Sequence, residues 1–328
     1  MNMKRYYFVF LFLLMSLGIM SLARPAAAQT VRTEKTDIQK ITNKVLSEEM
    51  LFLTRSIFIK PKEQVRVRLA SKLKSLTLET SGPVYVYTPD KKMKFRVGPP
   101  LGLLVSLNKD GTLVCVDVPM GKHIVIDPQQ GQTITFRGHV YNGVLHIFVM
   151  NGQISVVEYN DVETYLQGVV IPEMPPSAPL EALKAQAVAA RSYVLGKKQL
   201  STGKSFDVVN TPKDQYYVGV GSVTEKAIQA VKDTAGEVLF KDGKLLLAQY
   251  HAQCGGKTDE IPEGYCYFGS PAMKGVKCEN CNKEDKKRKG HGIGLCQEGA
   301  MGKVRCENMK YKEILEYYYP GTVVKKLD

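Results

Sequence analysis

The pattern of apolar and polar residues changes character along the chain. Residues 29–62 have mixed charge and a weak helical period, which predicts a linker or an added helix. Between residues 63 and 157, short β-branched runs alternate with Gly, Pro, Asp and Asn, as in a domain of β-hairpins. From 158 to 328, helical periods alternate with short strands. The pattern predicts an α+β fold, with an N-terminal β-rich hairpin domain packed against a mixed helical and β domain.

The most regular helical pattern lies between residues 179 and 198. Small or apolar side chains surround nearly the whole of this segment, so the helix is expected to be packed on two sides, with Ser177 as its N-cap. The apolar stripe consists of Leu180, Leu183, Ala187, Ala190 and Val194. Further helices are predicted over residues 161–170, 222–236 and 311–321. Hairpin turns are predicted at Asn142-Gly143 and Asp242-Gly243.

The first 28 residues have the composition of a secretory signal. Lys4 and Arg5 precede an apolar run over residues 8–22, and Ala26 and Ala28 follow it. The run is shorter than the roughly 20 residues that a membrane-spanning helix needs. An uncleaved anchor remains the alternative, and it would be the chain's only contact with a membrane. Either way, the rest of the chain is expected to be exported to the periplasm or cell envelope.

The composition is that of a folded, basic protein. The chain is 44% hydrophobic and 23% charged, with a net charge of +13. A basic surface favours anionic partners, including polymers that carry carboxylates. Nucleic acid is not expected as a partner, because the chain has no arginine-rich run and no alternation of basic and aromatic residues.

One acidic residue has unusual neighbours. Glu173 lies between Pro172 and Pro175, which are expected to hold it in an extended loop before the long helix. A fixed position suits a general acid, whose proton must lie within about 3 Å of its acceptor. The apolar neighbours Ile171 and Met174 should raise the pKa of the carboxyl by removing water, whereas a nearby helix N-terminus would lower it. Glu173 is therefore the candidate catalytic acid.

Two basic residues lie on the long helix beside its apolar stripe. Lys184 and Arg191 are two turns apart, on a line about 10 Å long. They are candidates to bind the carboxylates of a substrate. Alternatively, they form ion pairs with Glu181 and other acidic residues.

The cysteines allow two interpretations. The chain has seven, and Cys278 and Cys281 form a C-x-x-C motif, with His251 and Cys254 upstream. Three thiolates and one imidazole can bind structural zinc in a tetrahedral site. Disulfides are equally open for an exported protein, although an odd number leaves at least one cysteine unpaired. A metal-dependent amidase is not expected, because the five histidines are scattered without ligand spacing.

Five ordered motifs resemble the signatures of the stage II sporulation protein D family, which includes the amidase-enhancer proteins. They are "YLQGVVIPEMPPSAPLEALKAQAVAARSYVL", "DQYYVGV", "CGGKT", "GHGIGLCQEGA" and "YKEILEYYYPGT". The resemblance is close from about residue 158 to 325 and loose over the β region. It implies an exported lytic transglycosylase that cleaves peptidoglycan glycan strands to form 1,6-anhydromuramic acid, with Glu173 as the catalytic residue.

The resemblance also bears on the remaining candidates. The lactyl carboxylate of muramic acid would give Lys184 and Arg191 a role. Four further residues are candidate sugar contacts, each with a structural role as the alternative: Gln215, Tyr216, His291 and Gln297. The second function that the resemblance allows is a non-catalytic, peptidoglycan-binding enhancer of an N-acetylmuramoyl-L-alanine amidase. The expected partners are therefore glycan strands and a cell-wall amidase.

The chain departs from the family pattern at two places. Some members bind zinc just before their Q-x-Y motif, where this chain has Val209, Lys213 and Asp214, so that site is absent. Many members also have long strand-forming segments before "GHG", whereas here residues 282–289, "NKEDKKRK", bridge the gap. Loss of these strands is expected to lower the affinity for glycan strands.

Overall fold

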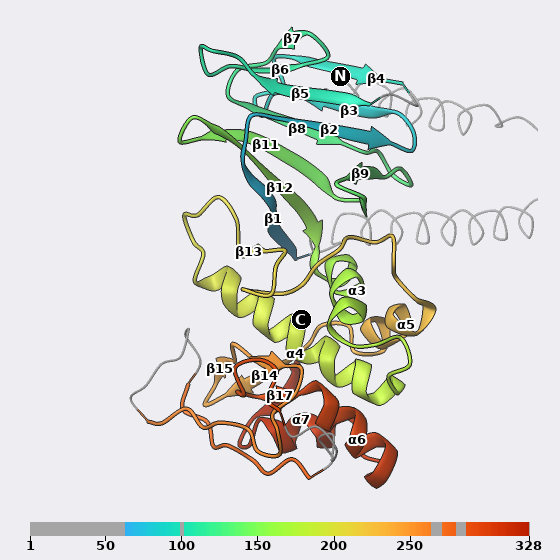
Figure 1. Ribbon diagram of the computed structural model, residues 1–328, viewed down its shortest axis with the longest axis vertical. Helices are drawn as coiled ribbons and strands as arrows, with labels where there is room; N and C mark the ends of the chain where they lie inside the picture. The colour runs from blue at the N-terminus through green and yellow to red at the C-terminus, as the bar shows by residue number, and fades with distance from the viewer. Residues whose placement is uncertain (1–62, 99–101, 264–270, 280–286, 328) are drawn as a thin grey trace, which may run out of the picture. The chain divides into compact units, whose positions relative to one another are not determined.

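The computed structural model describes residues 63–98, 102–263, 271–279 and 287–327 (Figure 1). The predicted signal or anchor and the predicted linker, residues 1–62, lie outside these described residues. Residues 62–328 form one compact unit that contains helices and several sheets, which confirms the α+β class. The predicted domain boundary between residues 157 and 158 falls within a strand and stays a prediction.

Most of the β-rich region is a seven-stranded sheet. Its strands, in spatial order, are β13 (Val208–Val209), β1 (Gln64–Leu73), β12 (Gln153–Asp161), β11 (Val144–Met150), β8 (His123–Asp127), β3 (Val84–Tyr87) and β4 (Lys94–Val97). All neighbours are antiparallel except β1 and β13, which are parallel. The parallel pair joins the β-rich region to the segment that follows the long helix.

A six-stranded sheet contributes to the same hydrophobic core. It consists of β10 (His139–Tyr141), β9 (Ile134–Phe136), β2 (Ser75–Thr80), β5 (Leu103–Leu107), β6 (Leu113–Cys115) and β7 (Val118–Pro119). Along β2, Leu76 and Leu78 are buried while Thr77 and Glu79 are exposed. This alternation means that the strand buries one face and presents the other to solvent. The buried faces of both sheets belong to one core.

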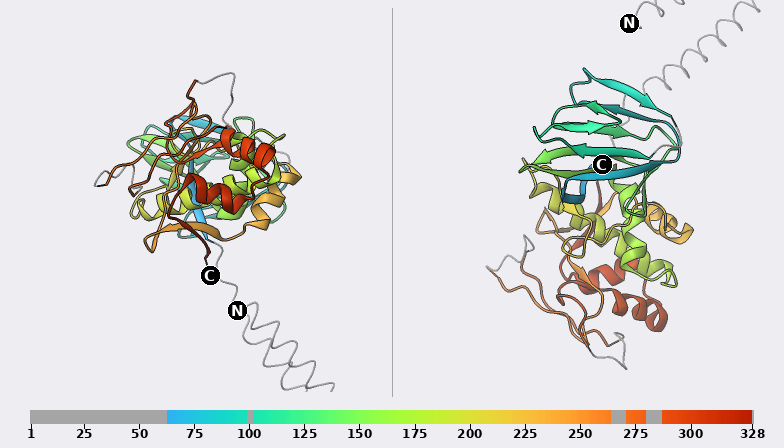
Figure 2. Two further views of the ribbon diagram at one scale, coloured as in Figure 1. Left: turned by 90° about the horizontal axis from the view of Figure 1, so that it is seen from below. Right: turned by 45° about the horizontal axis from the view of Figure 1, so that its top comes forward.

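The remaining region surrounds a central helix. Its helices are α3 (Val162–Glu173), α4 (Leu180–Gln199), α5 (Glu225–Asp233), α6 (Gln297–Glu307) and α7 (Tyr311–Tyr318). Two small sheets accompany them: β15 (Lys244–Leu245), β14 (Glu237–Lys241) and β18 (Val323–Lys326), and the parallel pair β16 (Tyr250–His251) and β17 (Leu295–Cys296). Helix α4 packs against the other four helices and β14, as the views in Figures 1 and 2 show. None of the described helices is long and apolar enough to cross a membrane.

The prediction of a helix packed on two sides is confirmed for α4. Leu183, Ala187 and Val194 on the stripe are fully buried, and so are Ala185 and Ala189 on the opposite side. The predicted cap is wrong: Pro179 occupies the N-cap position of α4, and within the described residues no side chain caps it. Helix α6, which lies in the "GHGIGLCQEGA" region, was not predicted.

The two predicted hairpin turns have opposite outcomes. Asp242 and Gly243 have φ angles of 49° and 74° and connect the paired strands β14 and β15, as predicted. Asn142-Gly143 instead connects β10 to β11, which lie in different sheets, so that prediction is wrong. Gly143 is needed for close packing, because a Cβ there would lie 2.6 Å from the carbonyl oxygen of Tyr159. Local turn chemistry does not reveal this tertiary contact.

Candidate functional site

The catalytic candidate Glu173 is the last residue of α3. The prediction of an extended loop is wrong, because the helix continues through Pro172, and only Met174 is extended, with φ −132° and ψ 143°. Pro172 has no N–H, so the carbonyl of Gly168 loses its donor within the helix. The backbone N–H of Val218 lies 3.5 Å from this carbonyl and donates to it instead. A tertiary contact thus takes the place of the helical hydrogen bond that Pro172 removes.

A glycine allows this contact to form. A Cβ on Gly168 would collide with the carbonyl oxygen of Gly219. The segment that contains Tyr216 and Val218 can therefore lie directly against α3. The N–H of Tyr216 donates to Oε1 of Glu173 at 2.8 Å, two residues before the N–H that binds Gly168.

The other oxygen of Glu173 has its own donor. Nε2 of Gln297 lies 3.3 Å from Oε2 of Glu173. Gln297 is the first residue of α6, and Cys296 is the N-cap of that helix. Two segments that lie 43 and 124 residues away in the sequence thus hold the carboxyl of Glu173 from different sides.

The surroundings favour the protonated form of Glu173. Burial raises the pKa of this carboxyl, and this effect exceeds the opposing hydrogen bonds from Tyr216, Gln297 and Tyr250. The last turn of a helix carries partial negative charge, which also disfavours a carboxylate. We expected a helix N-terminus to lower the pKa of Glu173. The carboxyl lies instead at the C-terminus of α3, which raises this pKa. A neutral carboxyl is the form that a general acid needs.

Gln215, which is buried, and Tyr250, which is half-buried, form a layer beside Glu173. Gln215 has 0% exposure, accepts from the hydroxyl of Tyr165 at 3.0 Å and donates to the hydroxyl of Tyr250 at 2.9 Å. Its amide also donates to the carbonyl of Ala190 at 3.2 Å. The structure therefore favours the packing role for Gln215 over direct contact with a sugar. Tyr250 lies in no recognisable motif, so its place beside Glu173 could not be predicted from the sequence.

Tyr216 and His291 are exposed near this layer. The side chain of Tyr216 is 44% exposed, while its backbone holds Glu173. His291 lies close to the backbone of Tyr250, and its Nδ1 accepts from the N–H of Ile293 at 3.1 Å. When the ring is neutral, Nε2 therefore carries the proton. Both side chains remain candidates to contact a ligand.

The two basic residues of α4 form internal ion pairs. Nζ of Lys184 lies 2.9 Å from Asp233 and 3.2 Å from Glu181. Arg191 is 1% exposed and forms two hydrogen bonds with Glu163, at 2.8 and 2.7 Å. The alternative in which these cations pair with acidic residues is the one that the structure shows. The prediction that they line a substrate-binding surface is therefore corrected.

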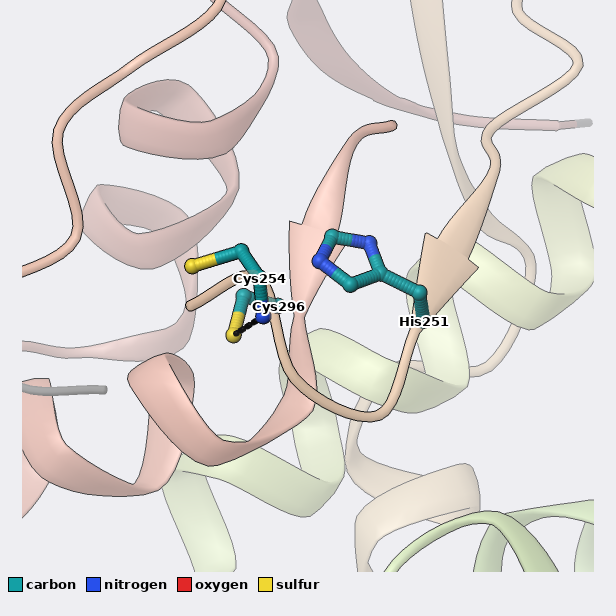
Figure 3. A group of neighbouring side chains, drawn as sticks. All are labelled: His251, Cys254 and Cys296. Carbon is teal, nitrogen blue, oxygen red and sulfur yellow. Dashed lines mark hydrogen bonds between the residues drawn. The ribbon is translucent and has the colours of Figure 1, made fainter. Parts of the chain in front are cut away.

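The predicted metal ligands are only partly brought together. His251 and Cys254 group with Cys296, and their ligand atoms all lie within 4.8 Å of one another (Figure 3). The thiol of Cys278 is within hydrogen-bonding reach of the Cys296 thiol. Cys281 lies outside the described residues. No sequence pattern points to Cys296 as a ligand, because it lies far from the C-x-x-C motif and has no cysteine at ligand spacing.

Comparisons with known proteins give three informative matches. Residues 150–240 match the family model described as "Stage II sporulation protein". The chain is 43% identical over 98 residues to an amidase enhancer of Bacillus subtilis, a match that covers 30% of this chain and 13% of that protein. It is 29% identical over 136 residues to stage II sporulation protein D of Bacillus subtilis, covering 37% and 39% of the two chains.

A longer match has no described activity. The chain is 26% identical over 349 residues to an uncharacterized protein of Brachyspira hyodysenteriae, covering 78% of this chain and 91% of that protein. The matches confirm the resemblance seen in the motifs. The chain is an α+β protein, and its residues 150–240 are similar to the stage II sporulation protein family.

Proposed function

We propose that this chain is an exported cell-wall protein that cleaves peptidoglycan glycan strands as a lytic transglycosylase. The observation that supports this proposal most strongly is the environment of Glu173. The carboxyl is partly buried at a helix C-terminus, its pKa is raised, and three donors from separate segments fix its position. These are the properties that a general acid requires.

The proposed reaction needs one carboxyl group. Protonated Glu173 donates its proton to the glycosidic oxygen that follows muramic acid, and the bond from that oxygen to the anomeric carbon breaks. The resulting carboxylate accepts the proton of the same sugar's 6-hydroxyl as that oxygen attacks the anomeric carbon. The products are a 1,6-anhydro sugar and a shortened strand, and Glu173 is protonated again. Because no water is consumed, the second carboxylate of most glycosidases is not needed.

The neighbours of Glu173 have separate roles in this reaction. The N–H of Tyr216 and the amide of Gln297 hold the carboxyl and stabilise the carboxylate that exists between the two proton transfers. The exposed ring of Tyr216 can pack against a sugar face. The exposed ring of His291 can contact the same sugar.

The match to an amidase enhancer favours one alternative function. In that case the same surface would bind glycan strands and recruit or stimulate an amidase, without cleaving the strands. Because the match covers only 13% of the amidase enhancer, the activity of that whole protein remains a proposal for this chain.

Digestion of purified glycan strands separates the two functions. Strands without stem peptides are incubated with the full chain alone, with a cell-wall amidase alone, and with both proteins. A transglycosylase releases fragments with 1,6-anhydro ends in the absence of the amidase, detected by mass spectrometry. Strand binding without fragments, together with faster release of stem peptides from intact peptidoglycan by the amidase, supports the enhancer instead.

A further inference from the structure

We infer that His251, Cys254, Cys278 and Cys296 form a structural zinc site that fixes the start of α6. This set differs from the one predicted from the sequence, because Cys296 replaces Cys281. The inference does not depend on the proposed enzymatic activity.

His251 has the arrangement of a metal-binding histidine. It is 4% exposed, and its Nδ1 lies 3.0 Å from the carbonyl oxygen of Ile293, to which it donates. This bond leaves a lone pair on Nε2, which is buried and has no hydrogen-bond partner among the described residues. Figure 3 shows the Nε2 edge of the ring turned toward the thiols of Cys254 and Cys296. Metal-bound histidines commonly donate their other N–H to a carbonyl in this way.

The two grouped thiols accept hydrogen bonds from the backbone. Sγ of Cys296 accepts from the N–H groups of Cys254 and Gly299, both at 3.3 Å. Sγ of Cys254 accepts from the N–H of Gly256 at 3.4 Å. These donors fix both sulfurs beside the imidazole of His251. Zinc binds cysteine as the thiolate, so the thiol protons would leave when the ion binds.

Cys278 can supply the fourth ligand. Its thiol is buried, lies 2.9 Å from the hydroxyl of Tyr318 and reaches the Cys296 thiol. Gly299 leaves the space for this thiol, since a Cβ at that position would collide with Sγ of Cys278. Three sulfurs and one imidazole nitrogen match the preference of zinc. Four protein ligands leave no open position, so the role is structural.

The site would connect three segments that lie far apart in the sequence. It links the end of β16, the segment around Cys278 and the start of α6. Gln297, which contacts Glu173, directly follows the ligand Cys296. Zinc would therefore fix the donor that holds one oxygen of the candidate acid.

Metal analysis of the full chain tests the inference. The protein is purified under reducing conditions with Zn²⁺ and weighed by native mass spectrometry before and after chelation. We expect one zinc ion per chain, lost on chelation, and protection of Cys254, Cys278 and Cys296 from alkylation only while zinc is bound. Exposed Cys306 should react in both states. This mapping uses the unaltered chain, so it does not depend on how variants fold.

Four variants identify the ligands. His251→Gln and Cys296→Ser should each weaken zinc binding by more than about 100-fold, because losing even a residue that only hydrogen-bonds a ligand costs roughly 10–100-fold in metal affinity. Cys306→Ser and Cys281→Ser should keep the zinc. The inference is overturned if the reduced chain takes up no zinc, or if peptide mapping finds a disulfide among the three thiols in the chain as isolated. It is also overturned if Cys281→Ser loses zinc while Cys296→Ser retains it.

Discussion

The backbone N–H of Tyr216 donates a 2.8 Å hydrogen bond to Oε1 of Glu173, across 43 residues of sequence. The bond depends on two features of α3. Pro172 leaves the carbonyl of Gly168 available for Val218, and Gly168 lets the chain around Gly219 approach the helix. The sequence between Gly168 and Glu173 therefore determines both the helix end and the contact that orients its carboxyl.

Gly168→Ala should disrupt this orientation. The added Cβ would collide with the carbonyl oxygen of Gly219 and push the segment that carries Tyr216 away from α3. Overpacking of this kind costs about 1–3 kcal/mol of unfolding free energy. Denaturant unfolding should show that loss, and glycan cleavage per folded molecule should fall as well. Gly98→Ala is the control, because no atom lies within 4 Å of its added Cβ. Unchanged activity in Gly168→Ala would contradict the orienting role.

Gln297→Leu should shift the pH profile of cleavage. The hydrogen bond from Gln297 lowers the pKa of Glu173, so its removal raises that pKa. Glu173 then stays protonated to higher pH, and the alkaline limb of the kcat/KM profile should shift to higher pH. A Gln297 that contacts only the sugar would instead raise KM and leave the limb in place. Profiles of the two proteins on the same glycan strands decide between these roles.

Arg191→Met should reduce stability rather than substrate affinity. The guanidinium is buried and forms two hydrogen bonds with Glu163 and one with the carbonyl of Glu237. Because the carboxylate of Glu163 that remains is partly exposed to water, the loss of these charged hydrogen bonds should cost about 1.5–3 kcal/mol. Denaturant unfolding measures this cost, with exposed Arg305→Met expected to stay within about 0.5 kcal/mol of the parent. If Arg191→Met has normal stability and a raised KM, Arg191 binds substrate and the structural interpretation is wrong.

Glu158→Gln should remove a pH dependence of stability. Burial raises the pKa of Glu158 to about 7, from an ordinary value of 4.5. The folded state therefore holds this proton more tightly than the unfolded state. The unfolding free energy should be highest below about pH 4.5 and should decline by about 3 kcal/mol as pH rises through about 7.

Unfolding from pH 4 to 8 checks this expectation. The variant should lose the decline between the two pKa values, whereas exposed Glu79→Gln should keep it. A decline of the same size in Glu158→Gln would assign the effect to other groups.

Several features could be predicted because their signals are local. The continuous small and apolar surface of α4 indicated a helix enclosed on two sides. Asp242-Gly243 identified a real hairpin, since both residues have positive φ angles there. Glu173 was selected by its two flanking prolines, and the structure places it beside Tyr216 and Gln297.

Other features depend on contacts between distant segments. Pro172 indicated an extended Glu173, but the donation from Val218 to Gly168 allows the helix to continue. Lys184 and Arg191 had the spacing of a binding surface, and only the fold shows that Asp233 and Glu163 neutralise them. Cys296 joins Cys254 through the pairing of β16 with β17, which no sequence spacing reveals.

The most direct test of the central claim is the cleavage rate of Glu173→Gln on purified glycan strands. Mass spectrometry measures the release of 1,6-anhydro ends over time, with exposed Glu225→Gln as the matched control. Loss of the general acid should reduce the rate by about 10²–10⁴-fold, while strand binding stays within a few-fold of the parent. Release of 1,6-anhydro ends at the parental rate by folded Glu173→Gln would contradict the account.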